Sequence, residues 1–259
     1  QLIHNKTSEV INFFVYCINT LIRPWLSPKM SQSMIGVMNG LGHNVQYGRG
    51  EEIYTSPNLF ERLMFVRSGV VVKALQDPVR SEPLMLSLSC AGAMCGSFEN
   101  LYVRDRLPRR HYCLTNAELL VINQELLLKI ADQNILWQRE LANYSSHCAL
   151  CDRLGMVANR FGSVEERLGA LLVLLQVEGN GEVEQRLTSP GIEWIAINTI
   201  PSLRTISLVL DTDISSLYAV VRQWIASNAL RKRAGRYWFK RSVFFDYRDW
   251  LHNIVRRNI

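Results

Sequence analysis

The sequence predicts an α+β fold with an N-terminal β-roll, a long helix and a C-terminal winged helix-turn-helix. Short apolar segments separated by glycine-containing turns fill residues 45–123. One uninterrupted helical pattern follows over residues 135–161, and residues 202–230 show two short helices joined by a tight turn. We expect a helical extension (1–44), a β-roll (45–133), a dimerisation helix (134–162), and a winged helix-turn-helix with an extra C-terminal helix (163–259).

Composition indicates a globular protein. The chain has 259 residues, of which 48% are hydrophobic and 20% charged, which allows two domains. Its apolar runs are too short to span a membrane, and six scattered cysteines favour reduced thiols in the cytoplasm. Paired carboxylates, a Ser/His/Asp set and a phosphate loop are all missing from the sequence. We therefore predict no enzymatic activity, no catalytic residue, no cofactor and no metal site.

The N-terminal part is expected to begin with two packing helices. Residues 8–26 and 31–41 have helical patterns, and the second ends in glycines. Strands then follow at short intervals, and the last of them, residues 118–122, closes a small β-barrel or roll. These helices should lie on the outside of that roll.

The long helix carries a stripe with coiled-coil spacing. Its residues recur at intervals of four and three, which favours a parallel pair with a second copy of the chain and hence a two-fold homodimer. The alternative is that this stripe packs on the chain's own barrel. The expected interface residues are Trp137, Leu141, Tyr144, Cys148 and Cys151. Cys148 and Cys151 form a C-x-x-C pair, which we interpret as small buried seam residues or, alternatively, as a cross-dimer disulfide that senses oxidants.

The C-terminal part shows where nucleic acid could bind. Asp213 is expected to cap a helix that buries Leu217, Val220, Val221, Trp224 and Ile225. A basic hairpin follows it, with a turn at Ala234-Gly235, as in a wing. The segment 222–259 has ten Lys or Arg and two Asp or Glu in a chain of net charge +6, so positive charge is localised. The expected DNA contacts are Ser202, Arg204, Ser215, Ser216, Tyr218, Arg222, Arg231, Lys232, Arg233 and Arg236.

The order of these parts resembles the Crp/Fnr superfamily of bacterial transcription regulators. The most specific local matches are residues 163–172, residues 202–230 and the glycine loop 92–97, and the resemblance covers roughly residues 45–241. The helices at both ends have no counterpart. The resemblance implies a cytoplasmic homodimer that binds double-stranded DNA, with RNA polymerase as a further candidate partner and no membrane association.

Two departures from the family pattern affect the expected ligand and the expected readout. Cyclic-nucleotide-binding members hold the ribose with a Gly-Glu pair and the phosphate with an Arg-Ser pair, whereas this chain has Ser97 and Leu107-Pro108 at those places. The candidate pocket residues are Ser97, Arg109 and Arg110, and control by cyclic AMP is not expected. Base-reading positions hold Ile214, Ser215 and Ala219, so we expect weaker base contacts and more reliance on phosphates and DNA shape.

The leading hypothesis is a homodimeric DNA-binding transcription regulator. The alternative is a ligand- or redox-sensing dimer whose winged helix docks protein rather than DNA. The missing base readers favour the alternative, whereas the basic C-terminal segment favours DNA.

Overall fold

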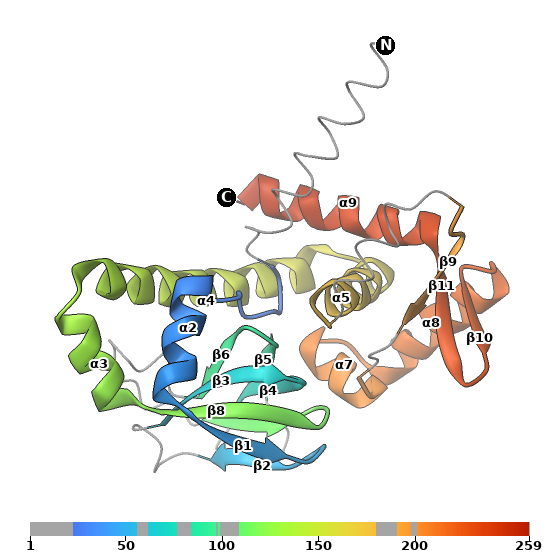
Figure 1. Ribbon diagram of the computed structural model, residues 1–259. Coiled ribbons are helices and arrows are strands. Elements are labelled where there is room, and N and C mark those ends of the chain that lie inside the picture. The colour runs from blue at the N-terminus through green and yellow to red at the C-terminus, as the bar shows by residue number, and fades with distance from the viewer. Residues whose placement is uncertain are drawn as a thin grey trace.

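The computed structural model of the chain describes residues 23–55, 62–76, 84–96, 98, 109–179, 191–197 and 201–258. Figure 1 shows a β-roll at one end, a mostly helical domain at the other, and a long helix that runs across both. Most of the helix expected over residues 8–26 lies outside the described residues. Among the helices that are described, none combines the length and the apolar character needed to cross a membrane.

The β-roll consists of two four-stranded antiparallel sheets with strand orders β1-β8-β3-β6 and β2-β7-β4-β5. Met64, Val71 and Leu119 are buried between the sheets, because alternate residues of each strand point inward. The strands are β1 (His43–Tyr47), β2 (Glu52–Thr55), β3 (Arg62–Ser68), β4 (Val70–Leu75), β5 (Leu84–Cys90), β6 (Met94–Gly96), β7 (Arg109–Cys113) and β8 (Ala117–Asn123).

Two short helices cover the outer face of the first sheet. Helix α2 (Gln32–Leu41) buries Met34 and Met38 against that sheet, and α3 (Gln124–Asp132) buries Leu127 in the same cluster. Ser31 caps α2 by accepting a hydrogen bond from the backbone N–H of Met34 at 3.3 Å. The expectation of an N-terminal packing helix is therefore confirmed for α2.

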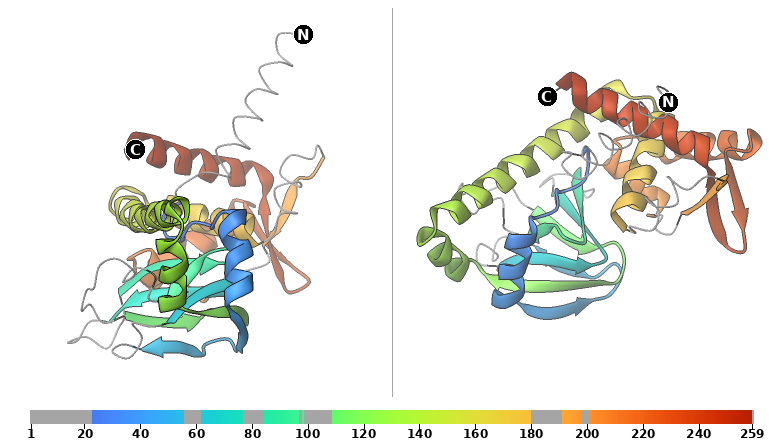
Figure 2. Two further views of the ribbon diagram at one scale, coloured as in Figure 1. Left: turned by 60° about the vertical axis from the view of Figure 1, so that its left-hand side comes forward. Right: turned by 45° about the horizontal axis from the view of Figure 1, so that its top comes forward.

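The long helix α4 (Ile135–Phe161) begins at its cap Asn134 and ends at Gly162, where α5 (Val164–Gly179) follows directly. Its N-terminal half lies along the roll and its C-terminal half reaches the helical domain, as Figure 1 and the right view of Figure 2 show. At the start of α5, the backbone N–H of Ser163 donates to Glu166 Oε2 at 2.8 Å, while the N–H of Glu166 donates to Ser163 Oγ at 3.2 Å. This reciprocal pair is a capping box, as the sequence predicts.

The helical domain contains the expected helix-turn-helix and wing. Leu168 from α5, Leu217 and Trp224 from the second helix and Phe239 from the wing share one buried cluster. The elements are β9 (Trp194–Ile197), α7 (Leu203–Val209), α8 (Ile214–Ala226), β10 (Leu230–Arg233) and β11 (Arg236–Lys240), with sheet order β10-β11-β9.

The C-terminal helix α9 (Arg241–Asn258) lies across α5 and the end of α4 (Figure 1). Its buried residues recur every three or four positions, which is the spacing of one helix face. Gly169 of α5 leaves room for the ring of Tyr247, because a Cβ atom there would lie 2.3 Å from that ring. The residues that α9 buries are Phe244, Tyr247, Leu251 and Val255.

Candidate nucleic-acid interface

The start of α8 is held by its cap. The Asp213 carboxylate accepts from the backbone N–H of Ser216 at 2.7 Å and from the Ser216 hydroxyl at 2.6 Å, and it also accepts from the Ser215 hydroxyl. These donors, the Ser215 hydroxyl foremost, lower the pKa of the Asp213 carboxyl. Both serine hydroxyls expected to contact DNA therefore already have a partner within the cap.

The solvent-facing side of α8 presents Tyr218 and Arg222, as expected from the sequence. The prediction that Ile225 is buried is wrong, because α8 buries only the face with Leu217, Val220 and Trp224, and Ile225 is 52% exposed. Ser216 is half-buried, and Ser202 acts as the N-cap of α7 by accepting from the N–H of Thr205 at 3.1 Å. The structure thus brings the expected residues of α8 to one exposed surface but assigns the serines a local structural role.

Two aromatic residues that donate to the same glutamate hold the buried face of α8 in place. The indole N–H of Trp224 and the hydroxyl of Tyr247 both donate to Glu165 Oε1, each at 2.9 Å. Trp224 also meets the Phe239 ring edge-on, with centroids 4.8 Å apart. Burial, together with the bond to Glu165, raises the pKa of Tyr247 well above its ordinary value. Helices α5, α8 and α9 are therefore joined at one carboxylate, and the wing contacts this cluster through the Phe239 ring.

The wing has a tight turn with basic residues on both sides. Ala234 and Gly235 have φ angles of 49° and 75°, which suit a two-residue hairpin turn of the kind that follows the right-handed strand twist. Arg233 and Arg236 face each other across that turn and are exposed. Arg231 was expected to contact a DNA phosphate. In the structure this residue is half-buried, and its guanidinium lies 3.8 Å from the Trp194 ring centroid.

Arg204 lines a cavity of about 750 Å³ between the roll and the turn of the helix-turn-helix. Leu84 of β5 and Ile214 of α8 line the same cavity, together with the carboxylates of Asp211 and Asp213. The start of α8 and the edge of the roll are therefore near neighbours in this arrangement.

The residues expected at a dimer interface occupy a different place. Most of the inner α4 stripe (Trp137, Leu141, Tyr144, Cys148 and Cys151) is buried within the chain itself. Leu141, Tyr144 and Cys148 belong to the cluster formed with the outer face of the first sheet, and only Trp137 is half-buried. The Tyr144 hydroxyl donates to the Pro28 carbonyl and accepts from the Met94 N–H, both at 2.8 Å. Most of the stripe therefore packs on the chain's own barrel, which is the alternative that its spacing left open.

Burial also bears on the C-x-x-C pair. Cys148 and Cys151 are both buried and neither is in a disulfide, and burial raises the pKa of the Cys151 thiol to about 11. A thiol of that pKa is almost entirely protonated at neutral pH, which is the unreactive form. Burial therefore favours a packing role for both cysteines over an oxidant-sensing disulfide between copies.

The candidate ligand residues do not converge in the described part of the chain. Ser97 lies outside the described residues, and the Arg110 side chain, about two-fifths exposed, pairs with Glu52 at 2.7 Å. Arg109 is buried, on the same strand as His111. Arg109 and Arg110 are neighbours on β7, so their side chains point to opposite faces of the sheet.

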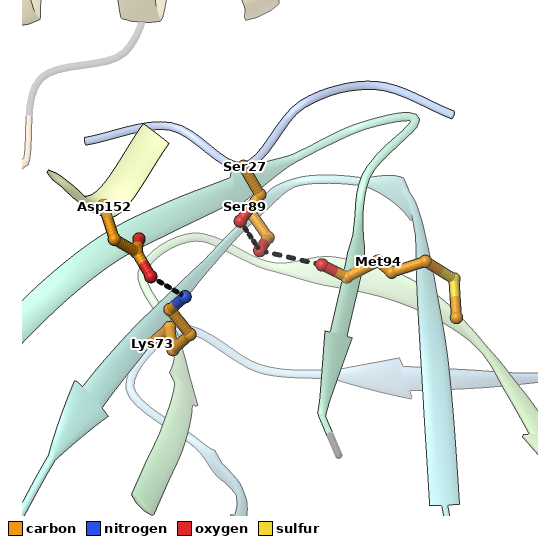
Figure 3. A network of polar contacts seen from close by, with 5 residues as sticks. All are labelled: Ser27, Lys73, Ser89, Met94 and Asp152. Atoms are coloured by element: carbon orange, nitrogen blue, oxygen red, sulfur yellow. Dashed lines mark hydrogen bonds and ion pairs between the residues drawn. The ribbon is translucent and has the colours of Figure 1, made fainter. Parts of the chain in front are cut away.

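Sequence reasoning missed a buried ion pair inside the roll. Lys73 of β4 reaches Asp152 of α4, with 2.6 Å between Lys73 Nζ and Asp152 Oδ2 (Figure 3). Close by, the Ser89 hydroxyl lies 3.0 Å from Ser27 Oγ and 3.1 Å from the Met94 carbonyl. The available signal was a lysine inside an otherwise apolar strand, which requires a partner.

Solved structures share this architecture. FixK2 from Bradyrhizobium japonicum aligns with a TM-score of 0.61 at 18% identity, over 83% of this chain and 97% of that one. TTHB099, a CRP-family transcriptional regulator from Thermus thermophilus, aligns with a TM-score of 0.60 at 13% identity, over 78% and 95% of the two chains. The c-di-GMP-responsive global regulator CLP from Xanthomonas campestris aligns with a TM-score of 0.54 at 14% identity, over 81% and 99%.

These structural neighbours are Crp/Fnr regulators, so the chain has the Crp/Fnr fold that its sequence predicts. At the level of sequence, neither the family models nor the curated proteins give a match. The identities to the solved structures are low, and the neighbours therefore establish the fold and not the activity of this chain.

Proposed function

We propose that the chain is a homodimeric, DNA-binding transcription regulator of the cytoplasm, without enzymatic activity and with RNA polymerase as a candidate partner. The observation that carries the proposal is the position of basic residues around α8. Arg222 on α8 and Lys232, Arg233 and Arg236 on the wing are exposed on the same small domain. In a helix-turn-helix, α8 is the helix that enters the major groove, and the wing then lies near the phosphates.

The dimer contact is proposed for the side of α4 opposite the roll. An outer α4 stripe of Ile135, Ala142, Ala149 and Met156 repeats every seven residues, and all four are exposed. Ile135 and Met156 are 73% and 67% exposed, which is unusual for large apolar side chains. A seven-residue apolar repeat is the pattern of paired helices, and the two small alanines would let two copies approach closely. Two-fold pairing here would present two copies of α8 to DNA.

We further propose that the regulator does not respond to cyclic AMP. The guanidinium of Arg110 pairs with Glu52, while the buried ammonium of Lys73 is paired with Asp152. A cyclic phosphate needs an available cation in a dry pocket. Titration calorimetry with cyclic AMP should therefore give no binding heat.

DNA binding is tested by selecting fragments from a pool of bacterial genomic DNA at moderate salt and sequencing those retained. We expect an inverted repeat with half-sites about one helical turn, roughly 10 base pairs, apart. For the selected duplex, the logarithm of affinity should fall linearly with the logarithm of salt concentration. Replacing Arg233 by Ala should reduce that slope by about 0.9 if it neutralises one phosphate.

The matched control is Arg67→Ala, which removes an exposed arginine from the roll. It should leave affinity and salt slope unchanged, because β3 lies in the other domain. Failure of the wild-type protein to retain any duplex would refute DNA binding. The winged helix would then be better explained as a protein-docking module.

A further inference from the structure

The exposed side of α8 is unusually apolar for a helix that reads DNA. Ile214, Tyr218 and Ile225 are 39%, 51% and 52% exposed, and they follow one another at intervals of four and seven residues. They form the apolar α8 stripe. Ala219 and Ala226 are exposed beside it. Large apolar groups in contact with water indicate a surface that binds something apolar.

Few side chains in the first half of α8 are available to form hydrogen bonds with bases, and this is the half that contacts base edges in a helix-turn-helix. The hydroxyls of Ser215 and Ser216 donate to Asp213. Arg222 and Gln223, the exposed side chains of α8 with long polar ends, stand in its third turn. What the first two turns offer a base is therefore the side chains of Ile214 and Tyr218 and the methyl group of Ala219.

The major groove contains one apolar group that matches these side chains. It is the C5 methyl of thymine, whereas the other base edges display hydrogen-bond donors and acceptors. Helix α8 has no Asp or Glu beyond its cap Asp213, and exposed basic residues flank it on the wing. This charge distribution favours a polyanion as the occupant over an apolar protein surface.

We propose that α8 recognises thymine in the major groove through apolar contacts of Ile214, Tyr218 and Ala219 with the C5 methyl groups. This inference rests on the proposed function, because it specifies how α8 selects its DNA. It also predicts what the operator contains, namely thymines at the positions that face the first two turns of α8 in each half-site.

The experiment uses the duplex selected from the genomic pool and replaces each thymine singly by deoxyuridine, which lacks only the methyl group. At contacted positions, affinity of the wild-type protein should fall about fourfold for each methyl removed, the factor for one buried carbon. Deoxyuridine at thymines in the flanking sequence should change nothing. Equal affinity for all single replacements, with tight binding retained, would overturn the inference and leave DNA binding intact.

Protein variants then identify the side chains responsible. Ile214→Ala and Tyr218→Ser should weaken binding and remove most of the difference between thymine and deoxyuridine. The matched control Arg222→Ala should weaken binding to both duplexes equally and keep that difference, because an arginine contacts polar atoms. Full discrimination retained in both Ile214→Ala and Tyr218→Ser would contradict the assignment. If the wild-type protein bound no duplex at all, both the inference and the proposed function would fall.

Discussion

Lys73 and Asp152 show how one buried pair connects the roll to the long helix. Lys73 is 5% exposed, and in the sheet it stands beside His111 on β7 and Ser87 on β5. A charge in such a place is tolerated only with a partner, since removing water from an ion costs several kcal/mol. Asp152 supplies that partner from α4, so this pair specifies where α4 crosses the roll.

Breaking this pair should destabilise the protein strongly. Lys73→Met leaves the half-buried Asp152 carboxylate without its cation, and we expect a loss of about 3 kcal/mol in the free energy of unfolding. The double variant Lys73→Met/Asp152→Leu should lose less than Lys73→Met alone, because no unpaired charge remains. Urea unfolding followed by circular dichroism measures both.

The exposed pair Arg67–Glu118, at 3.4 Å, is the matched control. Replacing Arg67 by Ala should cost less than about 1 kcal/mol, since surface ion pairs contribute little. A similar loss for Lys73→Met and Arg67→Ala would show that Lys73–Asp152 is not an essential pair.

At the residue scale, local contacts could be predicted from the sequence, whereas long-range contacts could not. The caps at Ser163 and Asp213 could be predicted, because their partners stand three residues away along the chain. Lys73 and Asp152 are 79 residues apart, and so are not paired by any local pattern. The same holds for Glu165 and Tyr247, which are 82 residues apart.

At the scale of the element, α4 carries two stripes that both fit a coiled coil. The inner α4 stripe is buried against the roll, whereas the outer α4 stripe remains exposed. Spacing alone could not decide between them, because the three- and four-residue intervals of the inner stripe and the seven-residue interval of the outer one both fit a heptad repeat. The inner α4 stripe has the larger apolar side chains, and these are the side chains that the roll covers. The helix itself was predictable, but the direction of each face depended on tertiary contacts.

The outer α4 stripe makes a clear prediction about assembly. Ala149→Glu would bring two carboxylates together across a two-fold contact, and like charges at such a contact are unfavourable. We expect this variant to be monomeric by sedimentation at concentrations where the wild-type chain is dimeric. His147→Glu, also exposed on α4 but outside the stripe, should remain dimeric. A dimeric Ala149→Glu would exclude this face as the interface.

At the scale of the whole molecule, the appended helix α9 is part of the domain that carries α8. The buried residues of α9 join the same core as those of α5, α8 and the wing. The Glu165 carboxylate binds Tyr247 of α9 and Trp224 of α8 through the same oxygen atom. A displacement of α9 should therefore reach α8, the helix that we propose reads DNA.

Gly169→Ala tests this coupling. The added Cβ atom would lie 2.3 Å from the ring of Tyr247, a buried ring bonded to Glu165, so the ring must move. Overpacking of this kind costs about 1–3 kcal/mol, and we expect a lower melting temperature together with weaker binding to the selected duplex. Gly36→Ala is the matched control, because Gly36 lies in α2 with nothing within 4 Å of the added atom, and alanine should stabilise that helix by up to about 1 kcal/mol. Weaker DNA binding by Gly169→Ala at a temperature where it is fully folded would show that α9 positions α8, whereas unchanged binding would limit α9 to stabilising the domain.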